Sequence, residues 1–521
     1  MLNSPITDLF QQSKKNKDKI FIVDKDYEVT FSDLYSQVLS VASFLISVGI
    51  NKGDRVGVLM PKSYLQVVSK LGIMAAGAVM VPISELLKSN QVHHIINDCQ
   101  ISLVIIDGEK IDLLTPERGK LKILELDGSS NINLKEVIKT GFIENIPNMI
   151  SQDNAAIIYT SGSTGMPKGI VLSHGNLWDG ARIVSSYLNL REDDRLAQVL
   201  SLNFDYGLNQ IFSAIHVGAQ VYLTTFHFPK DIFDFIRSKK ITNLALMPIF
   251  LNRLFDTHFF KPDFANDIVS LRRITTSGGR VSKNIINIIK AVFPKTDLYL
   301  MYGLTESFRS TFLPPDKLET HSNSIGKAIP DVEILILDEN GDECEPNKNG
   351  ELVHRGGVIA KGYWNSPLKT KKRFKLWKDS SGNREIVVFS GDIVRRDSEG
   401  FIYFIGRKDN MIKTSGHRVS PEEVEQAVEL MNNIEHAVVF SIENDILGEE
   451  IVLACVRKKD CIDPEASDVK IFLRKKLAAY MIPNKILFFD SFEVTPGNQG
   501  KTDRKLVKSV AMNEIKKNEE N

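Results

Sequence analysis

Apolar side chains recur at two different spacings along the chain, and the spacing alternates from one segment to the next. In residues 31–48 they fall every three to four positions, which predicts an amphipathic helix that ends at Gly49. Shorter continuous apolar runs predict buried strands. Strands are predicted at residues 55–60, 79–83, 102–106, 220–224 and 243–247, and helices at residues 64–76, 176–188 and 231–238. This alternation predicts an α/β fold with parallel, doubly wound sheets, and we expect two such layers, before and after Ser151.

From about residue 325 the pattern changes to short alternating strands, separated by Asn-Gly turns at residues 340–341 and 349–350. This pattern predicts a small β-rich, barrel-like subdomain. A polar break at residues 406–410 follows, and then a strand precedes a helix with Pro421 in its first turn. We therefore expect a large N-terminal domain of residues 1–408 and a small α+β domain of residues 409–521.

Composition and charge narrow the function classes. The chain has 65 Lys and Arg residues and 65 Asp and Glu residues. It therefore has no excess positive charge that would predict a nucleic acid or an anionic membrane surface as partner. The longest apolar stretch, residues 71–83, is too short for a membrane span. The four cysteines form no Cys-x-x-Cys pair, which predicts a reducing compartment without structural zinc, and we expect a cytoplasmic protein.

A glycine-rich loop between two apolar runs carries the clearest chemistry. Residues 159–169 read Tyr-Thr-Ser-Gly-Ser-Thr-Gly-Met-Pro-Lys-Gly. Glycine lets the backbone approach a ligand closely, and backbone N–H groups and hydroxyls can converge on anionic oxygens. The loop is not a Walker A motif, because Pro167 interrupts it and no Gly-Lys-Ser/Thr triplet follows. It predicts a polyphosphate site formed by Thr160, Ser161, Gly162, Ser163, Thr164, Gly165 and Lys168.

This loop resembles, residue for residue, the signature of the AMP-forming adenylating superfamily, which includes acyl-CoA synthetases, nonribosomal adenylation domains and luciferase. Three later segments match further signatures of the superfamily in order: residues 301–306 (Met-Tyr-Gly-Leu-Thr-Glu), residues 390–392 (Ser-Gly-Asp) and residues 501–504 (Lys-Thr-Asp-Arg). The resemblance implies ATP and Mg²⁺ as cofactors. It also implies activation of a carboxylic acid as an acyl-adenylate, followed by acyl transfer to the thiol of CoA or of a carrier-protein phosphopantetheine.

The side chains of these motifs suit the implied chemistry. Glu306 offers a hard oxygen ligand beside a threonine hydroxyl, as an Mg²⁺–phosphate site needs, and the two oxygens of Asp392 match a vicinal diol. The resemblance implies Mg²⁺ binding by Glu306 and Thr160, a catalytic role for Thr305, nucleotide contacts from Tyr302, Gly303, Gly278, Gly279 and Arg280, and ribose contacts from Asp392 and Arg407.

The resemblance places the catalytic cation in the small domain. Lys501 would bridge the substrate carboxylate and the α-phosphate, where negative charge accumulates during adenylation. The match is imperfect, since one extra residue, Gln499, stands before Gly500. Members of the superfamily swing the small domain about a hinge, which corresponds to Asp409, and Gly416 would leave room for the thiol arm in a pantetheine tunnel.

The acid itself is less defined by the sequence. Phe204 and Asp205 resemble the Phe-Asp pair of amino-acid adenylation domains, whose aspartate binds the substrate ammonium, but the usual continuation is replaced by Tyr206 and Gly207. Because this continuation is lost, the sequence somewhat favours a structural or capping role of Asp205 in an acyl-CoA ligase with a different pocket. The expected substrate pocket comprises Phe204, Asp205, Met247, Ser277 and Tyr302. The bulky side chains around this pocket predict a small or medium acid. An acid–CoA ligase and a stand-alone activator serving a carrier protein both remain open, beside a catalytically silent nucleotide-binding protein.

Overall fold

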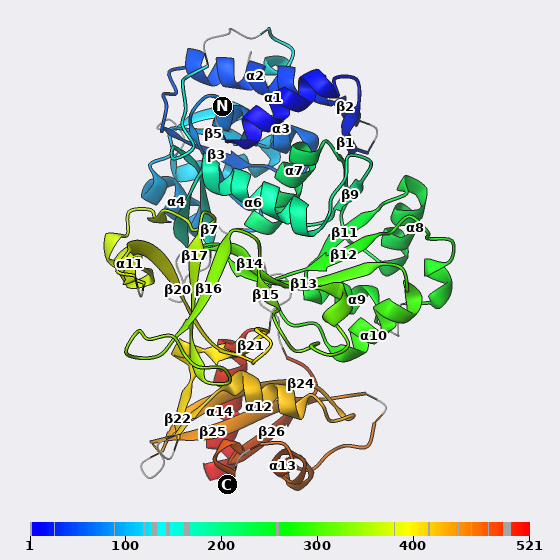
Figure 1. The fold of residues 1–521 in the computed structure, drawn as a ribbon, viewed down its shortest axis with the longest axis vertical. Helices are drawn as coiled ribbons and strands as arrows, with labels where there is room; N and C mark the ends of the chain where they lie inside the picture. Colours follow the sequence, from blue (N-terminus) through cyan, green and yellow to red (C-terminus); the bar gives the residue numbers. More distant parts are fainter. Residues whose placement is uncertain are drawn as a thin grey trace. The chain divides into compact units, whose positions relative to one another are not determined.

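The structure is a computed structural model. It describes residues 3–520 except residues 26, 88, 118–120, 128–132, 142–145, 161–166, 257–259, 380, 415–416, 445–447, 460, 478 and 493–501. The chain forms two compact units (Figure 1). The first unit comprises Met1–Ile334 and Val353–Phe389, and the second comprises Leu335–Leu352 and Ser390–Asn521. The predicted boundary between residues 408 and 409 falls inside the second unit and stays a prediction about a movable domain.

One sheet of the first unit has seven strands in the order β18-β8-β7-β4-β3-β5-β6. Strands β3 to β7 pair in parallel, whereas β8 and the edge strand β18 run antiparallel to their neighbours. The strands are β3 (Arg55–Leu59), β4 (Val79–Pro82), β5 (Leu103–Ile106), β6 (Lys122–Glu125), β7 (Asn154–Thr160), β8 (Lys168–Ser173) and β18 (Gly362–Tyr363). The predicted strands at residues 55–60, 79–83 and 102–106 are confirmed within two residues.

The second sheet of this unit has nine strands in the order β15-β14-β13-β12-β11-β9-β10-β1-β2. Its central strands are parallel, while β2, β14 and β15 are antiparallel. The strands are β1 (Ile20–Asp24), β2 (Tyr27–Thr30), β9 (Arg195–Gln198), β10 (Gln220–Leu223), β11 (Asn243–Leu246), β12 (Arg273–Thr276), β13 (Asp297–Leu304), β14 (Phe308–Leu313) and β15 (Lys327–Ala328).

The expected count of two layers is confirmed, but the expected division at Ser151 is wrong. Strands β7 and β8 follow that residue and yet complete the first sheet, whereas β1 and β2 precede it and join the second sheet through the parallel pairing of β1 with β10. The periodicity of a strand shows that it will be buried, but it does not show which neighbour will pair with it.

Helices pack between the two sheets and share one hydrophobic core with both of them. Val41 of α2, Leu71 of α3, Ala181 of α6 and Ile211 of α7 belong to this core, and Figure 1 shows α6 and α7 between the two groups of strands. The helices of the first unit are α1 (Pro5–Lys15), α2 (Phe31–Ser47), α3 (Tyr64–Ala75), α4 (Ser89–Cys99), α5 (Leu134–Val137), α6 (His174–Tyr187), α7 (Asp205–Val217), α8 (Pro229–Lys239), α9 (Pro248–Leu254), α10 (Lys283–Val292) and α11 (Pro367–Arg373).

The predicted β-rich subdomain is a five-stranded sheet, and the division between the units passes through its strands. Its order is β16-β17-β20-β19, with β21 beside β20. The strands are β16 (Val332–Leu337), β17 (Asn349–Gly356), β19 (Phe374–Lys378), β20 (Arg384–Arg396) and β21 (Ile402–Arg407).

The remainder of the second unit is the predicted α+β fold. One sheet has the order β23-β22-β25-β24, with β26 paired to β25. Its elements are β22 (Ile412–Thr414), β23 (His417–Val419), α12 (Pro421–Val428), β24 (Ile434–Asn444), β25 (Gly448–Arg457), α13 (Ala466–Arg474), β26 (Lys485–Phe489) and α14 (Arg504–Glu520). The hydroxyl of Ser420 caps α12 by accepting a hydrogen bond from the Glu423 N–H, which explains why the helix begins at Pro421.

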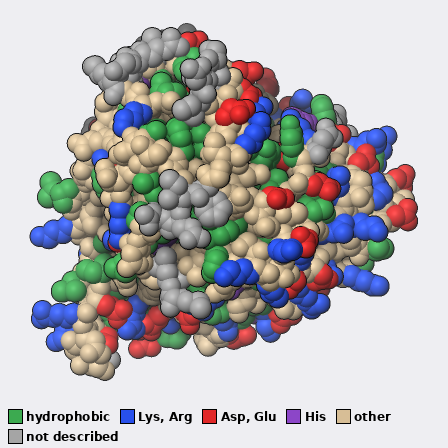
Figure 2. All heavy atoms as spheres, turned by 90° about the horizontal axis from the view of Figure 1, so that it is seen from above, with side chains coloured by type: hydrophobic (Ala, Val, Ile, Leu, Met, Phe, Trp, Pro, Cys, Tyr) green, Lys and Arg blue, Asp and Glu red, His purple; other side chains and the backbone are tan. Residues whose placement is uncertain are grey.

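Charged side chains of both signs mix on the surface. On the face in Figure 2, lysine and arginine lie near aspartate and glutamate in several places, with hydrophobic and other residues over the rest of the described surface. In the part of the chain that the structure describes, no helix is both long and apolar enough to cross a bilayer.

Candidate functional site

Strands β7 and β8 hold the two ends of the predicted phosphate loop. They pair in an antiparallel register that sets Thr160 opposite Lys168. The predicted contacts Ser161, Gly162, Ser163, Thr164 and Gly165 lie outside the described residues. The buried Thr160 hydroxyl has no hydrogen-bond partner among the residues described, and a ligand oxygen or cation could satisfy it.

Lys168, Glu306 and Tyr363 form a three-residue cluster at the base of this loop. The Lys168 ammonium lies 3.0 Å from a Glu306 carboxylate oxygen and 3.0 Å from the Tyr363 hydroxyl, which donates to the same carboxylate at 2.6 Å. Burial alone would raise the pKa of the Glu306 carboxyl. The Lys168 charge and the Tyr363 hydrogen bond outweigh burial, so the pKa lies below its ordinary value and Glu306 is an anion at neutral pH.

A tight hairpin positions Glu306. Strand β13 ends at Leu304, β14 starts at Phe308, and the two pair at that point. Only glycine fits at position 303, because a Cβ there would lie 2.0 Å from the Phe308 carbonyl oxygen. The backbone carbonyl of Glu306 accepts a hydrogen bond of 2.9 Å from the Ala360 N–H. The carboxylate therefore stands on a rigid turn at the end of the sheet.

Tyr302, one residue before that glycine, stacks on a buried histidine. The rings of Tyr302 and His354 are nearly parallel, at 11°, with centroids 6.3 Å apart. His354 is fully buried, and neither of its ring nitrogens has a hydrogen-bond partner in the described part of the chain. The stacked imidazole fixes the plane of the Tyr302 ring. Because a buried charge without a partner is costly, this imidazole is stable only in its neutral form.

Acid should therefore weaken the first unit. Burial, with a further contribution from Arg373, lowers the pKa of His354 to about 3, whereas an unfolded histidine titrates near pH 6.5. Between these values the unfolded state binds a proton that the folded state does not bind. The contribution of His354 to stability is complete above pH 6.5 and is lost as pH falls toward 3, at about 1.4 kcal/mol per pH unit.

Urea unfolding at pH 7.5, 5.5 and 4.5 checks this expectation. His354→Phe keeps a ring against Tyr302 but removes the titration, so its free energy of unfolding should decline less steeply with acid by about 1.4 kcal/mol per pH unit. The exposed His227 provides the control, and His227→Gln should leave the slope unchanged. Equal slopes for wild type and His354→Phe would contradict the prediction.

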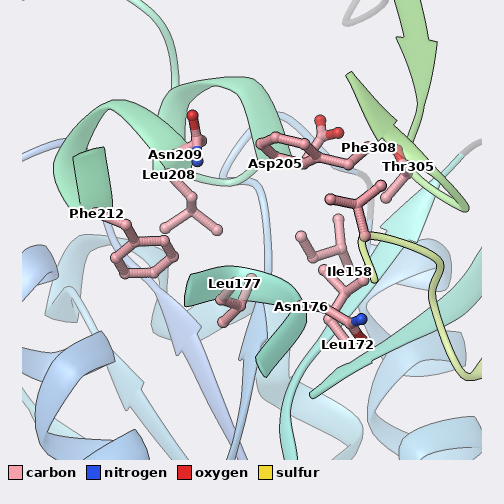
Figure 3. A pocket seen from close by; sticks show the side chains of 11 residues that line it. Ile158, Leu172, Asn176, Leu177, Asp205, Leu208, Asn209, Phe212, Thr305 and Phe308 are labelled. Atoms are coloured by element: carbon pink, nitrogen blue, oxygen red, sulfur yellow. The ribbon is translucent and has the colours of Figure 1, made fainter. Parts of the chain in front are cut away.

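A small cavity, called the acid cavity below, is lined by Asp205 but not by the other expected pocket residues, which are Phe204, Met247, Ser277 and Tyr302 (Figure 3). It has room for about one water molecule in this form. Figure 3 shows Asp205, Thr305 and Phe308 at one end and apolar side chains of α6 and α7 at the other. The residues that line it are Ile158, Leu172, Asn176, Leu177, Asp205, Leu208, Asn209, Phe212, Thr305, Phe308 and Val358. The structure thus brings Asp205 and Thr305 together.

Asp205 is the first residue of α7, and one of its carboxylate oxygens accepts a hydrogen bond of 2.9 Å from the Tyr206 N–H. Burial raises the pKa of this carboxyl, and the charge of Arg309 opposes the rise. Gly207 is required at its position because a Cβ would lie 1.9 Å from the Ser201 carbonyl oxygen. A larger residue at this position would therefore clash with the backbone in this conformation.

The predicted adenine loop follows β12. Gly278 has a φ of +91°, a conformation that L side chains rarely adopt, and a Cβ there would lie 3.5 Å from the Met247 Cε. Met247 precedes α9, so the structure places this predicted pocket residue beside the loop. Ser277 is buried at the end of the loop, and an Arg280 nitrogen donates 3.0 Å to the Asn323 side chain.

In the second unit, Asp392 and Arg407 lie opposite one another on β20 and β21 and form an ion pair. Asp392 is buried, with 2% of its surface exposed, and its N–H donates 2.9 Å to the Ser390 hydroxyl. Asp409 lies in a short 3₁₀ turn, Lys408–Asn410, and its side chain is not described. Gly416 and Lys501 lie outside the described residues.

Tyr363 and Arg309 were missed by sequence reasoning. Tyr363 reaches Glu306 only because β18 pairs with β8, and a two-residue strand carries no periodic signal. Arg309 is three residues beyond Glu306, in a strand of mixed polar and apolar residues that gave no signal of a buried arginine.

Two family models match the chain. The model for the AMP-binding enzyme matches residues 9–364, and the model for the AMP-binding enzyme C-terminal domain matches residues 423–497. Gramicidin S synthase 1 of Brevibacillus brevis is 29% identical over 502 residues, which are 95% of this chain and 43% of the synthase. The chain thus spans less than half the length of that relative. The mitochondrial medium-chain acyl-CoA ligase ACSF2 of Rattus norvegicus is 27% identical, covering 94% of this chain and 84% of the ligase.

Solved structures share the fold. ATP-bound MatB from Rhodopseudomonas palustris aligns with a TM-score of 0.87 at 24% identity, covering 98% of this chain and 99% of MatB. The anthranilate CoA ligase AuaEII in complex with anthranoyl-AMP aligns with a TM-score of 0.84 at 24% identity, covering 98% of this chain and 97% of the ligase. The fold, the ordered signatures and the long family match agree: the chain belongs to the family of AMP-binding enzymes.

Proposed function

We propose that the protein is an ATP-dependent, AMP-forming ligase that joins a carboxylic acid to a thiol, with CoA as the thiol. The observation that carries this proposal is the anionic Glu306, held by Lys168 and Tyr363 at the base of the phosphate loop. In the first step the acid attacks the α-phosphorus of ATP, and pyrophosphate leaves. In the second step the thiol attacks the acyl carbonyl, and AMP leaves.

The donors fit Mg²⁺, because Glu306 and Thr160 offer hard oxygens and Thr160 has an unsatisfied hydroxyl. Among the residues that the structure describes, no group of three or more His, Cys, Asp or Glu side chains could hold a metal. Glu306 would therefore share the ion with phosphate oxygens, and the ion would neutralise charge on the triphosphate.

The other roles in the proposal follow the family signatures. Residues 161–165 and Thr160 bind the departing pyrophosphate, Gly278 and Gly279 leave room for the adenine beside Arg280, and Asp392 with Arg407 binds the ribose. Lys501 stabilises the charge that develops at the reacting carboxylate and α-phosphate. Asp409 is the hinge, and Gly416 lines the path of the thiol arm. The four free cysteines support a cytoplasmic location.

A second candidate, a stand-alone activator that loads a carrier protein, has its support in Asp205 and in the similarity to peptide synthetases. ATP–pyrophosphate exchange with a panel of acids and amino acids tests both, with CoA and a phosphopantetheine-loaded carrier protein compared as acceptors. We expect acyl-CoA to form. Transfer only to the carrier protein would favour the second candidate, and no exchange with any acid would leave only nucleotide binding.

Lys168→Ala should slow adenylation without abolishing it. Lys168 is partly exposed and contacts the carboxylate rather than the reacting acid, so we expect about a tenfold loss in the exchange rate. Without this cation the pKa of Glu306 rises, and the acid limb of the pH–rate profile should move to higher pH. Lys361→Ala, at an exposed lysine before β18, is the control. Complete loss, or an unmoved acid limb, would contradict this role.

A further inference from the structure

An arginine without a carboxylate partner lies beside the acid cavity. Arg309, on β14, is 4% exposed, and its guanidinium carbon is 4.8 Å from the centroid of the Tyr206 ring and 4.3 Å from that of Phe308. No carboxylate oxygen in the described part of the chain lies within 4.0 Å of its nitrogens. The effective penalty for burying an ion is several kcal/mol, so an unpaired guanidinium at this depth is costly to the free protein.

Two of its three nitrogens also lack hydrogen-bond partners. Nη2 donates to the Asn209 side chain, whereas Nε and Nη1 are buried without a partner among the described residues. Burial raises the pKa of Tyr187, and Arg309 opposes the rise through its charge and a side-chain hydrogen bond, while the Tyr187 hydroxyl donates to the Met301 sulfur at 2.9 Å. Free N–H groups on a planar cation match the oxygens of a carboxylate.

Arg309 lines a second small cavity, whose wall is mainly apolar but includes several polar side chains. Both side-chain atoms of Gln210 and the carbonyl oxygen of Asn243 are buried there without described partners. Asn209 lines this cavity and also the acid cavity of Figure 3. The polar residues of the wall are Tyr206, Asn209, Gln210, Ser213, Asn243, Thr275 and Arg309. A ligand that enters past Asn209 would meet hydrogen-bonding groups and one cation.

We propose that Arg309 is a specificity-determining residue that binds a second carboxylate at the far end of the acid, so that the substrate is a small dicarboxylic acid activated at one carboxyl group. This inference rests on the proposed ligase function. The second carboxylate would pair with the buried cation and satisfy Nε or Nη1. The cavity has room for about one water molecule in this form, which is less than a carboxylate needs, so side chains of its wall such as the unbonded Gln210 amide must move to admit the group.

The same cation argues against an amino acid. An α-ammonium placed at Asp205 would lie in the field of Arg309, which already acts on the Asp205 carboxyl. The like charges would repel in a space with little water to screen them. Arg309 therefore favours an anionic substrate tail and weakens the ammonium-binding alternative for Asp205.

The test compares acids of matched length in ATP–pyrophosphate exchange: malonate with propionate, succinate with butyrate, and glutarate with valerate. We expect wild type to prefer one dicarboxylate by roughly 100-fold in kcat/KM. Arg309→Met keeps an apolar stem against Tyr206 and Phe308 but removes the charge. It should lose that preference, chiefly through KM, while the matched monocarboxylate is used as well as before or better. Arg182→Met removes a surface arginine that also stacks on an aromatic ring, at Trp178, and should change nothing.

Thermal unfolding provides a readout independent of turnover. The preferred dicarboxylate should raise the Tm of wild type and of Arg182→Met but not that of Arg309→Met. If Arg309→Met does not fold, Arg309→Lys is tested in its place. Lysine keeps the charge but cannot bind a carboxylate with two parallel N–H groups, so KM for the dicarboxylate should rise by about tenfold. Preference for monocarboxylates, or equal loss of all acids in a folded Arg309→Met, would overturn the inference while leaving the ligase function intact. Arg309-dependent stabilisation by a dicarboxylate without exchange would support the inference and overturn the ligase function.

Discussion

Replacing Lys501 with alanine is expected to lower ATP–pyrophosphate exchange by roughly 10² to 10³-fold, the cost of losing one group that stabilises charge in a transition state. Thioester formation from a supplied acyl-adenylate should proceed at close to the wild-type rate. The two steps separate because the cation acts where the acid meets the α-phosphate, and that bond is already made in the adenylate.

Two residues that follow Lys501 in the signature, Asp503 and Arg504, have structural roles. Asp503 accepts hydrogen bonds of 3.0 Å and 3.1 Å from the N–H groups of Lys505 and Leu506 at the start of α14. Arg504 binds the buried carboxylate of Glu425 with two nitrogens, and Glu425 also accepts 2.6 Å from the Val439 N–H. The Asp of the signature therefore caps the start of α14, the Arg anchors this helix to α12, and Lys501 precedes the helix in the sequence.

The exposed Lys505 supplies the control, because Lys505→Ala removes a lysine from the same segment without touching these anchors. It should retain wild-type exchange. The assignment of Lys501 fails if Lys501→Ala exchanges pyrophosphate at the wild-type rate, or if it loses both half-reactions equally.

Glu306→Gln should cost a similar factor, roughly 10² to 10³-fold in exchange. The amide oxygen can still accept hydrogen bonds from Lys168 and Tyr363, so the hairpin should keep its structure and its Tm. The negative charge that would bind Mg²⁺ is gone, however. Exchange should therefore need a higher Mg²⁺ concentration, and the acid limb of the pH–rate profile, which Glu306 would produce in wild type, should disappear.

Glu319→Gln is the matched control, because it neutralises an exposed carboxylate that pairs with Lys290 on the surface. It should leave exchange and the Mg²⁺ requirement unchanged. If Glu306→Gln keeps most of its exchange activity with an unaltered Mg²⁺ requirement, Glu306 is a structural partner of Lys168 rather than a metal ligand.

Much of the local structure could be predicted from the sequence. The helix expected at residues 64–76 is α3 at Tyr64–Ala75, and the helix expected at residues 31–48 is α2, capped by the Thr30 hydroxyl. Such elements depend on apolar periodicity and capping residues, which are local features. The membership of strands in sheets was not predictable in this way, because β1 (Ile20–Asp24) pairs with β10 (Gln220–Leu223), which lies far from it in the sequence.

In the candidate site, too, the residues in short motifs were predictable from the sequence and their tertiary contacts were not. The phosphate loop, Glu306 and Asp392 lie in motifs whose residues are contiguous, so their order along the chain identified them. Their partners come from distant segments: Tyr363 reaches Glu306 through a two-residue strand, and Asn209 of α7 meets Arg309 of β14 in the core. Neither contact has a local signature.

The sequence by itself determined the alternation of helices and strands, the family and the groups that suit ATP chemistry, because these are encoded in spacing and in short motifs. Only the tertiary structure decided that Glu306 is anionic and clamped by Lys168 and Tyr363, and that Arg309 is buried without a carboxylate partner among the described residues. Charge state and pairing depend on burial and on which strands become neighbours, and those are properties of the packed chain rather than of any single segment.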